Sequence, residues 1–126
     1  MPNKSEFEWR GATFVLSNSV WSDIMTLTLQ NRFTTPDDAD HAIRSDFCYV
    51  LAHLESVKGL PGWKPVDETA TPEQFRACYK GLMSQIENIN EFYELVRAVN
   101  ALKAPKAGPL DKPDEALTEE EQADPN

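Results

Sequence analysis

Alternating apolar and polar residues at the start of the chain predict a short β-hairpin. Phe7 and Trp9 alternate with polar residues before Gly11, and Phe14 and Leu16 alternate with other residues after it. A period of two on both sides of a glycine is typical of two strands joined by a tight turn. Because a lone hairpin is only marginally stable in water, we expect it to pack on other elements. An irregular arm lying on the helices is the alternative.

Apolar residues at helical spacing predict three helices in the rest of the chain. The first covers Val20–Phe33, after a serine- and asparagine-rich segment that can supply an N-cap. The second covers 36–58, because Thr35 can cap it, a proline suits its first position and Gly59 ends it. The third covers 72–103, where no proline interrupts the pattern. The centres of the apolar stripes predict these core residues: Phe47, Leu51, Leu82 and Ile86.

The segment 60–71 separates the second and third helices and is predicted to be a loop. Pro61, Gly62 and Pro65 exclude a regular element there. Trp63 lies in the middle of this loop and allows two interpretations. It either anchors the loop by packing back on the core, or it is an exposed aromatic residue that binds a partner.

The third predicted helix is longer than the domain that contains it. About 32 residues at about 1.5 Å each give about 48 Å, whereas a domain of about 100 residues is only about 35 Å across. The helix therefore extends beyond its own domain, breaks near Gly81, or is covered by another chain.

The end of this helix is the candidate partner-binding surface. Apolar residues between Phe92 and Leu102 spread over more than half of the circumference, and such helices are usually buried on more than one face. A partner helix or a second copy of the chain can supply the missing cover, so we predict binding by Phe92, Leu95, Val99 and Leu102, with Trp63 as a further candidate. The alternative is a central helix wrapped by the other elements of the domain.

Composition adds an acidic balance to this picture. The chain has 126 residues, with 12 Lys and Arg against 21 Asp and Glu, a net charge of −9 and a pI of about 4.6. Nonspecific binding of nucleic acid requires a basic surface, so we expect no nucleic-acid partner. No apolar run approaches the ~18 residues of a membrane span, and the first residues lack the apolar core of a secretory signal. Cys48 and Cys78 are expected to be buried thiols in a reducing compartment.

The composition changes sharply near Ala104. The segment 104–126 holds four of the nine prolines, seven acidic residues and only two large apolar residues. Such a segment buries too little apolar surface to offset the entropy of ordering it. We therefore predict a single domain over 1–103 and a disordered acidic tail over 104–126. The whole pattern predicts a mainly α fold, in which a short N-terminal β-hairpin packs on a small bundle of about three helices, the last one long.

The sequence offers no pattern that is typical of catalysis or of a cofactor site. Asp37, Asp38, Asp40 and His41 look like a metal cluster, but a helix N-terminus explains the acids and consecutive positions do not converge on one point. We therefore expect no enzyme, no cofactor and no metal.

The layout of the chain resembles the tail assembly chaperones of long-tailed, siphovirus-like bacteriophages. The features that carry the resemblance are the hairpin with FEWRG and FVL, the loop with LPGW, the helix ending in EFYELVRAVNAL and the proline-rich acidic tail. The resemblance implies a non-enzymatic protein that binds the helical tape measure protein and keeps it soluble during tail assembly. It also implies self-association, action in the host cell cytoplasm, absence from the mature virion and, in many members, a longer frameshifted form.

Two other functions fit the same sequence. One is a small structural protein at a phage neck or tail junction, which would remain in the particle. The other is an acidic inhibitor of a nucleic-acid enzyme, which would need the acidic tail for its activity.

Overall fold

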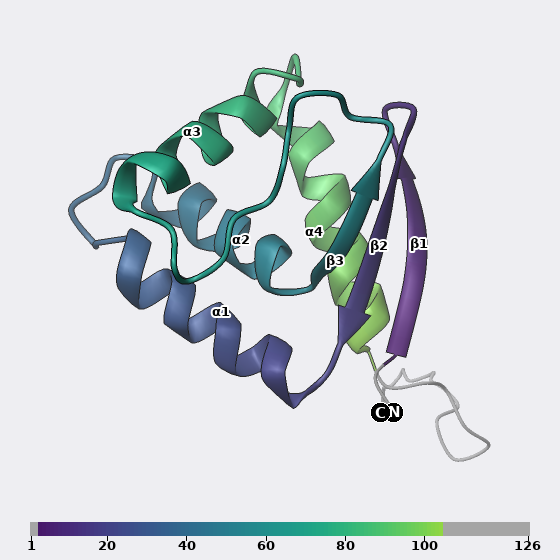
Figure 1. The fold of residues 1–126 in the computed structure, drawn as a ribbon, viewed down its shortest axis with the longest axis horizontal. Helices are drawn as coiled ribbons and strands as arrows, with labels where there is room; N and C mark the ends of the chain where they lie inside the picture. Colours follow the sequence, from purple (N-terminus) through teal and green to yellow (C-terminus); the bar gives the residue numbers. More distant parts are fainter. Residues whose placement is uncertain (1–2, 105–126) are drawn as a thin grey trace, which may run out of the picture.

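The computed structural model describes residues 3–104 and contains a three-stranded antiparallel sheet and four helices (Figure 1). The fold class is therefore α+β, and the prediction of a mainly α fold with only a two-stranded hairpin is wrong. The predicted tail lies outside the described residues, apart from Ala104. The elements are β1 (Asn3–Trp9), β2 (Ala12–Asn18), α1 (Val20–Phe33), α2 (His41–Ala52), β3 (Leu54–Lys58), α3 (Pro72–Met83) and α4 (Ile89–Lys103).

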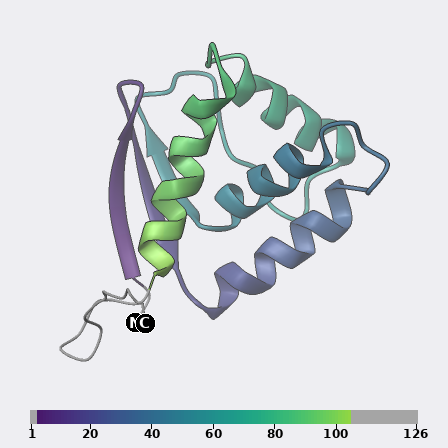
Figure 2. The ribbon, with the colours of Figure 1, turned by 180° about the vertical axis from the view of Figure 1, so that it is seen from behind.

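The predicted hairpin is confirmed, and it forms two of the three strands. β1 pairs with β2 in a register that places Phe7 opposite Phe14. Arg10 and Gly11 make the turn, and both have positive φ, as a two-residue type I′ turn requires. One face of the sheet carries the buried side chains, and α4 lies along that face (Figure 2). The hairpin thus packs on a helix, as expected for a hairpin that is only marginally stable by itself in water.

The third strand was missed because its apolar spacing looks helical. The predicted helix over 36–58 begins only at His41 and ends at Ala52, and β3 follows it. Leu54 and Val57 are three residues apart, which suits a helix. A bulge in the pairing of β2 with β3 inserts one extra residue between them, so both still pair with core-facing residues of β2.

The predicted long helix is two helices. α3 ends at Met83, one turn or less after Gly81, and α4 begins at Ile89, so of the three possibilities the break near Gly81 is the one observed. Asn88 caps α4, because its side chain accepts a hydrogen bond of 3.0 Å from the backbone N–H of Asn90. Asparagine competes with the helix for backbone hydrogen bonds and favours a new start. The bend removes the excess length that the sequence analysis found.

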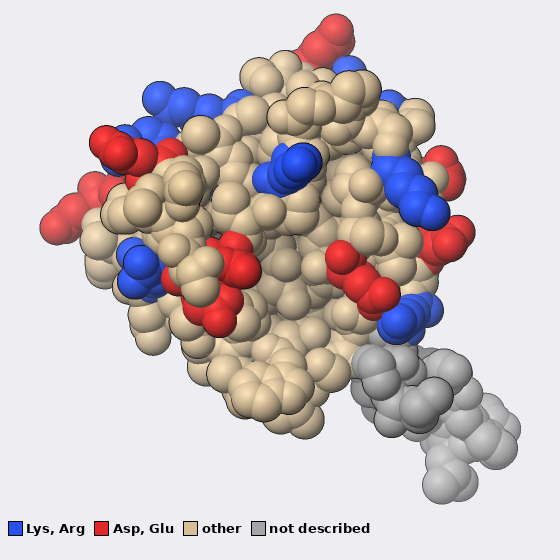
Figure 3. Space-filling model, in the orientation of Figure 1, with Lys and Arg blue, Asp and Glu red and all other residues tan. Residues whose placement is uncertain are grey.

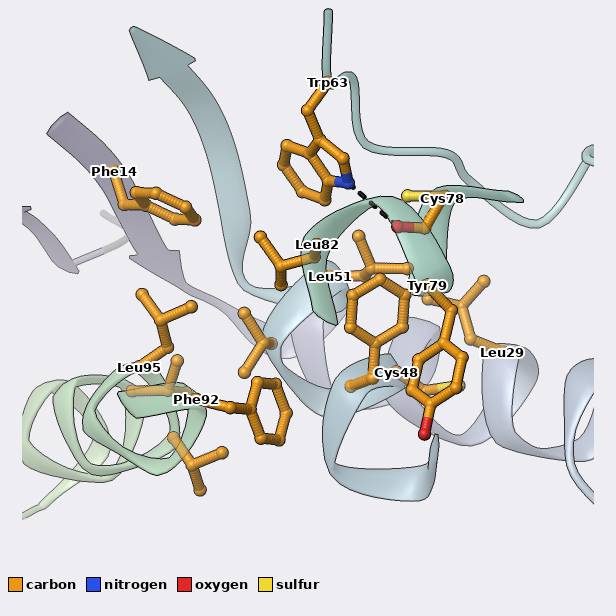
Figure 4. Close-up of a cluster of buried hydrophobic side chains, with 14 of the residues drawn as sticks. Phe14, Leu29, Cys48, Leu51, Trp63, Cys78, Tyr79, Leu82, Phe92 and Leu95 are labelled. Carbon is orange, nitrogen blue, oxygen red and sulfur yellow. Dashed lines mark hydrogen bonds between the residues drawn. The ribbon is translucent and has the colours of Figure 1, made fainter. Parts of the chain in front are cut away.

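A single aromatic-rich core joins the sheet to the helices (Figure 4). The ring of Phe47 lies edge-on to Phe75 and Tyr79, with centroids 5.6 and 5.2 Å apart, and Phe33 stacks on Phe75 at 4.4 Å. The bounds of α1 are confirmed as predicted. Three of the four predicted core residues are buried, and the fourth is partly buried against the same cluster: Phe47, Leu51, Leu82 and Ile86.

Candidate partner-binding surface

The domain itself covers the end of α4 that the sequence analysis assigned to a partner. Phe92, Leu95 and Val99 are fully buried, and Leu102 is partly buried against the core. β1 and β2 pack on one side of α4 and α2 packs on another. The expectation that the core leaves these residues uncovered is therefore wrong, because a helix between a sheet and another helix needs several apolar faces.

Trp63 is buried as well, and the first interpretation of this residue is confirmed. Its indole Nε1 donates a hydrogen bond of 2.9 Å to the backbone oxygen of Cys78 in α3 (Figure 4). Its ring stacks against Phe14 at 6.3 Å, so the loop is attached to both the sheet and a helix. A Cβ added at Gly81 would lie 3.1 Å from the Trp63 ring, and glycine there lets the indole approach the helix closely. Trp63 is thus a structural anchor.

The large exposed apolar side chains gather on α1 instead. Val20, Trp21, Leu27 and Ile24 are 74%, 73%, 63% and 45% exposed. These four residues are called the α1 stripe below. Val20, Ile24 and Leu27 lie on the side of the helix opposite its buried residues, which are Ser22, Leu29 and Phe33, and Trp21 lies on the flank beside them. In Figure 3, the lowest part of the molecule, where α1 begins, shows no charged side chains, and acidic groups lie just above it. No helix among the described residues is long and apolar enough to cross a bilayer.

A shallow groove lies beside α1 on the face seen in Figure 3, and acidic groups flank the hollow. Its volume is about 320 Å³. Met25 and Leu29 of α1 form one wall, and Leu54 and Asp67 belong to the other side. The groove lies beside α1 and leads from the α1 stripe toward the loop that Trp63 anchors.

The sequence contained a signal for this surface. Within Val20–Phe33 apolar residues occur on more than one side of the helix, and Asp23 and Arg32 are its only charged residues. In a small domain, a helix with apolar residues on several sides is either enclosed by other elements or leaves one apolar face in contact with solvent. Spacing alone did not show which helix of the domain had the uncovered face.

The two cysteines offer no reactive thiol. Both are free and buried. Burial raises the pKa of Cys48 to about 12 and the pKa of Cys78 to about 11, so both are protonated at neutral pH. Cys78 lines a second cavity of about 580 Å³ between the 62–70 loop and α3, where its Sγ donates to the backbone oxygen of Lys64. Within residues 3–104, no group of three or more His, Cys, Asp or Glu side chains is placed to hold a metal ion.

His53 is a buried titratable group next to α1 and α4. Its Nδ1 lies 2.8 Å from the backbone oxygen of Tyr49, and its Nε2 has no hydrogen-bond partner in the described part of the chain. Burial lowers the pKa of His53 and outweighs the hydrogen bond to the Tyr49 backbone oxygen, which raises it. The charge of Lys103 lowers the pKa further, and Asp23 opposes that effect. A charged imidazole is therefore disfavoured in the folded state.

The free energy of unfolding should consequently fall as the pH drops below neutral. A His53 pKa that is lower in the folded than in the unfolded chain makes the unfolded chain bind more protons once the pH falls below about 6.5. Stability is full above that value and declines as the pH approaches the folded-state pKa. Urea unfolding at several pH values between about 7 and about 5 should show this slope, and His53→Gln should flatten it. An unchanged slope in the variant would assign the acid sensitivity to other groups.

A scan against models of protein families, a search of curated proteins and a search of solved structures each gave no match. Among residues 3–104, the α1 stripe holds the most exposed of the large apolar side chains, which contribute little to the packing of the domain itself.

Proposed function

We propose that this protein is a non-enzymatic tail assembly chaperone of a long-tailed bacteriophage. In this role it binds apolar helical segments of the tape measure protein and keeps that protein soluble while the tail is assembled. The observation that carries the proposal is the exposed α1 stripe on an otherwise well-packed domain. The layout of the sequence, which resembles that of these chaperones, supports the same function.

The physical basis is the docking of one amphipathic helix on another. A long helical protein that has not yet been enclosed exposes apolar side chains, which aggregate in water. The α1 stripe presents four large side chains on one side of a rigid helix. Covering each of them removes apolar surface from water and contributes on the order of 1 kcal/mol or more. The acidic chain, with a net charge of −9, keeps such a complex soluble by mutual repulsion.

The proposal extends to where the protein acts. It works in the host cell cytoplasm, self-associates as chaperones of this kind do, and leaves before the virion is complete. Mass spectrometry of purified virions should therefore not find it. Its stable presence in the particle would favour a structural protein of the neck or tail junction instead.

The α1 stripe can be tested by charge substitution. Co-expression with the candidate tape measure protein should keep that protein in the soluble fraction, and the double variant Ile24→Asp, Leu27→Asp should lose this effect, because a carboxylate in an apolar contact has no compensating partner. The control is Ile89→Asp, which places one carboxylate on another exposed isoleucine, at the start of α4, and should leave the protection intact. A folded double variant that still keeps the tape measure protein soluble would place the binding surface elsewhere.

A further inference from the structure

The α1 stripe has the spacing of a seam between two helices. Val20, Ile24 and Leu27 are separated by four and then three residues, and Asn31, four residues further on, is also exposed. Alternating steps of three and four are the spacing of the core positions in a two-helix coiled coil. Trp21 lies next to this seam and widens it toward the groove. The surface is therefore shaped for one helix lying along α1.

The charged groups beside this seam are mostly acidic. Asp23 lies on one side of it, and its side chain stays 66% exposed although Lys103 contacts it. On the other side Asp67 lines the groove, and Glu68 follows it in the chain. Two cations lie nearby, and both are engaged within the domain. Arg32 donates to the backbone oxygen of Ala70 and lies over the Phe33 ring, and Lys103 forms an ion pair with Asp23 that leaves most of the Asp23 side chain in solvent.

We infer that the segment bound by the α1 stripe is an amphipathic helix of another protein that carries Lys or Arg side chains beside its apolar seam. This inference rests on the proposed function and names the chemistry of the partner. Basic side chains next to the seam meet Asp23 on one side and Asp67 on the other, and the net charge of −9 attracts them at longer range. A second copy of the chain is a poorer occupant, because it brings the same negative charge and a second Asp23 to the contact.

Three synthetic helical peptides test this chemistry. They share one apolar seam of about three heptads and differ only in the flanking positions, which are Lys, Gln or Glu. Fluorescence anisotropy with the labelled peptides and the full chain should give an affinity for the Lys peptide about tenfold higher than for the Gln peptide, with the Glu peptide weakest. The double variant Ile24→Asp, Leu27→Asp should bind none of them.

Variants that remove carboxylates show whether the preference for the Lys peptide comes from Asp23 and Asp67 at the contact or from the net charge of the whole chain. Asp23→Asn with Asp67→Asn should reduce the preference for the Lys peptide to about twofold or less. Glu73→Gln with Glu94→Gln changes the net charge equally at exposed positions on α3 and α4, and should leave the preference intact. Equal affinity for the Lys and Gln peptides, or the same loss in both double variants, would overturn the inference.

A wild-type dimer in analytical ultracentrifugation that Ile24→Asp, Leu27→Asp dissociates would also overturn it, because a second copy would then occupy the α1 stripe.

The proposed function and this inference can fail separately. Peptide selectivity as expected, without protection of the tape measure protein, would leave the inference standing and refute the chaperone function. Protection that requires the α1 stripe, without any preference for the Lys peptide, would leave the chaperone function standing and refute the inference.

Discussion

Replacing Leu95 with aspartate should prevent the domain from folding. Leu95 is fully buried where α4 packs against the sheet and α2. Losing a buried leucine side chain costs about 2–5 kcal/mol, and burying an unpaired carboxylate costs several kcal/mol more. Their sum is comparable with the total stability of a small domain, which is about 5–15 kcal/mol. Circular dichroism of Leu95→Asp should accordingly show no cooperative thermal transition.

Leu27→Asp is the matched control, because it makes the same chemical change on an exposed leucine. Its side chain is largely in solvent, so the free energy of unfolding should change by no more than about 0.5 kcal/mol. Comparing the two variants shows whether the apolar face of α4 with Leu95 or that of α1 with Leu27 belongs to the core. A cooperatively folded Leu95→Asp chain, or an unfolded Leu27→Asp chain, would contradict the packing described above.

Elements with strong local signals could be predicted from the sequence. The hairpin follows from two-residue alternation around Gly11, and the bounds of α1 follow from its apolar spacing and the residues before it. β3 could not be predicted in the same way. Its apolar residues Leu54 and Val57 have helical spacing. They pair with the core-facing residues of β2 only because of a bulge, and no pattern in the sequence predicts that bulge.

The candidate surface was misplaced for a related reason. Residues 92–102 and Val20–Phe33 are both apolar on more than one face, and both patterns allow an uncovered face. Which helix has one depends on the number of elements available to cover it. Without β3 and without the break between α3 and α4, the domain appeared too small to enclose Leu95 and Val99. For Trp63 the sequence left two interpretations open, anchor or partner-binding residue, and the burial of its indole in the structure decides for the anchor.

The two tryptophans Trp63 and Trp21 should respond to truncation in opposite ways. Trp63→Ala removes a buried indole that connects the loop to Phe14 and α3, and it should lower the free energy of unfolding by about 3–5 kcal/mol in urea titrations. Trp21→Ala removes an exposed indole and should change the same quantity by no more than about 0.5 kcal/mol.

Binding should show the reverse order, because the two indoles serve different purposes. Trp21→Ala should weaken binding of the Lys-flanked peptide by about tenfold or more, as expected for an aromatic residue inside a helix-binding surface. Trp63→Ala, measured at a temperature where the variant is still folded, should bind that peptide within about twofold of the wild-type chain, because the buried indole has little exposed surface to contribute. A large stability loss for Trp21→Ala would place α1 inside the core. A selective binding loss for folded Trp63→Ala would instead move the partner surface toward the 60–71 loop.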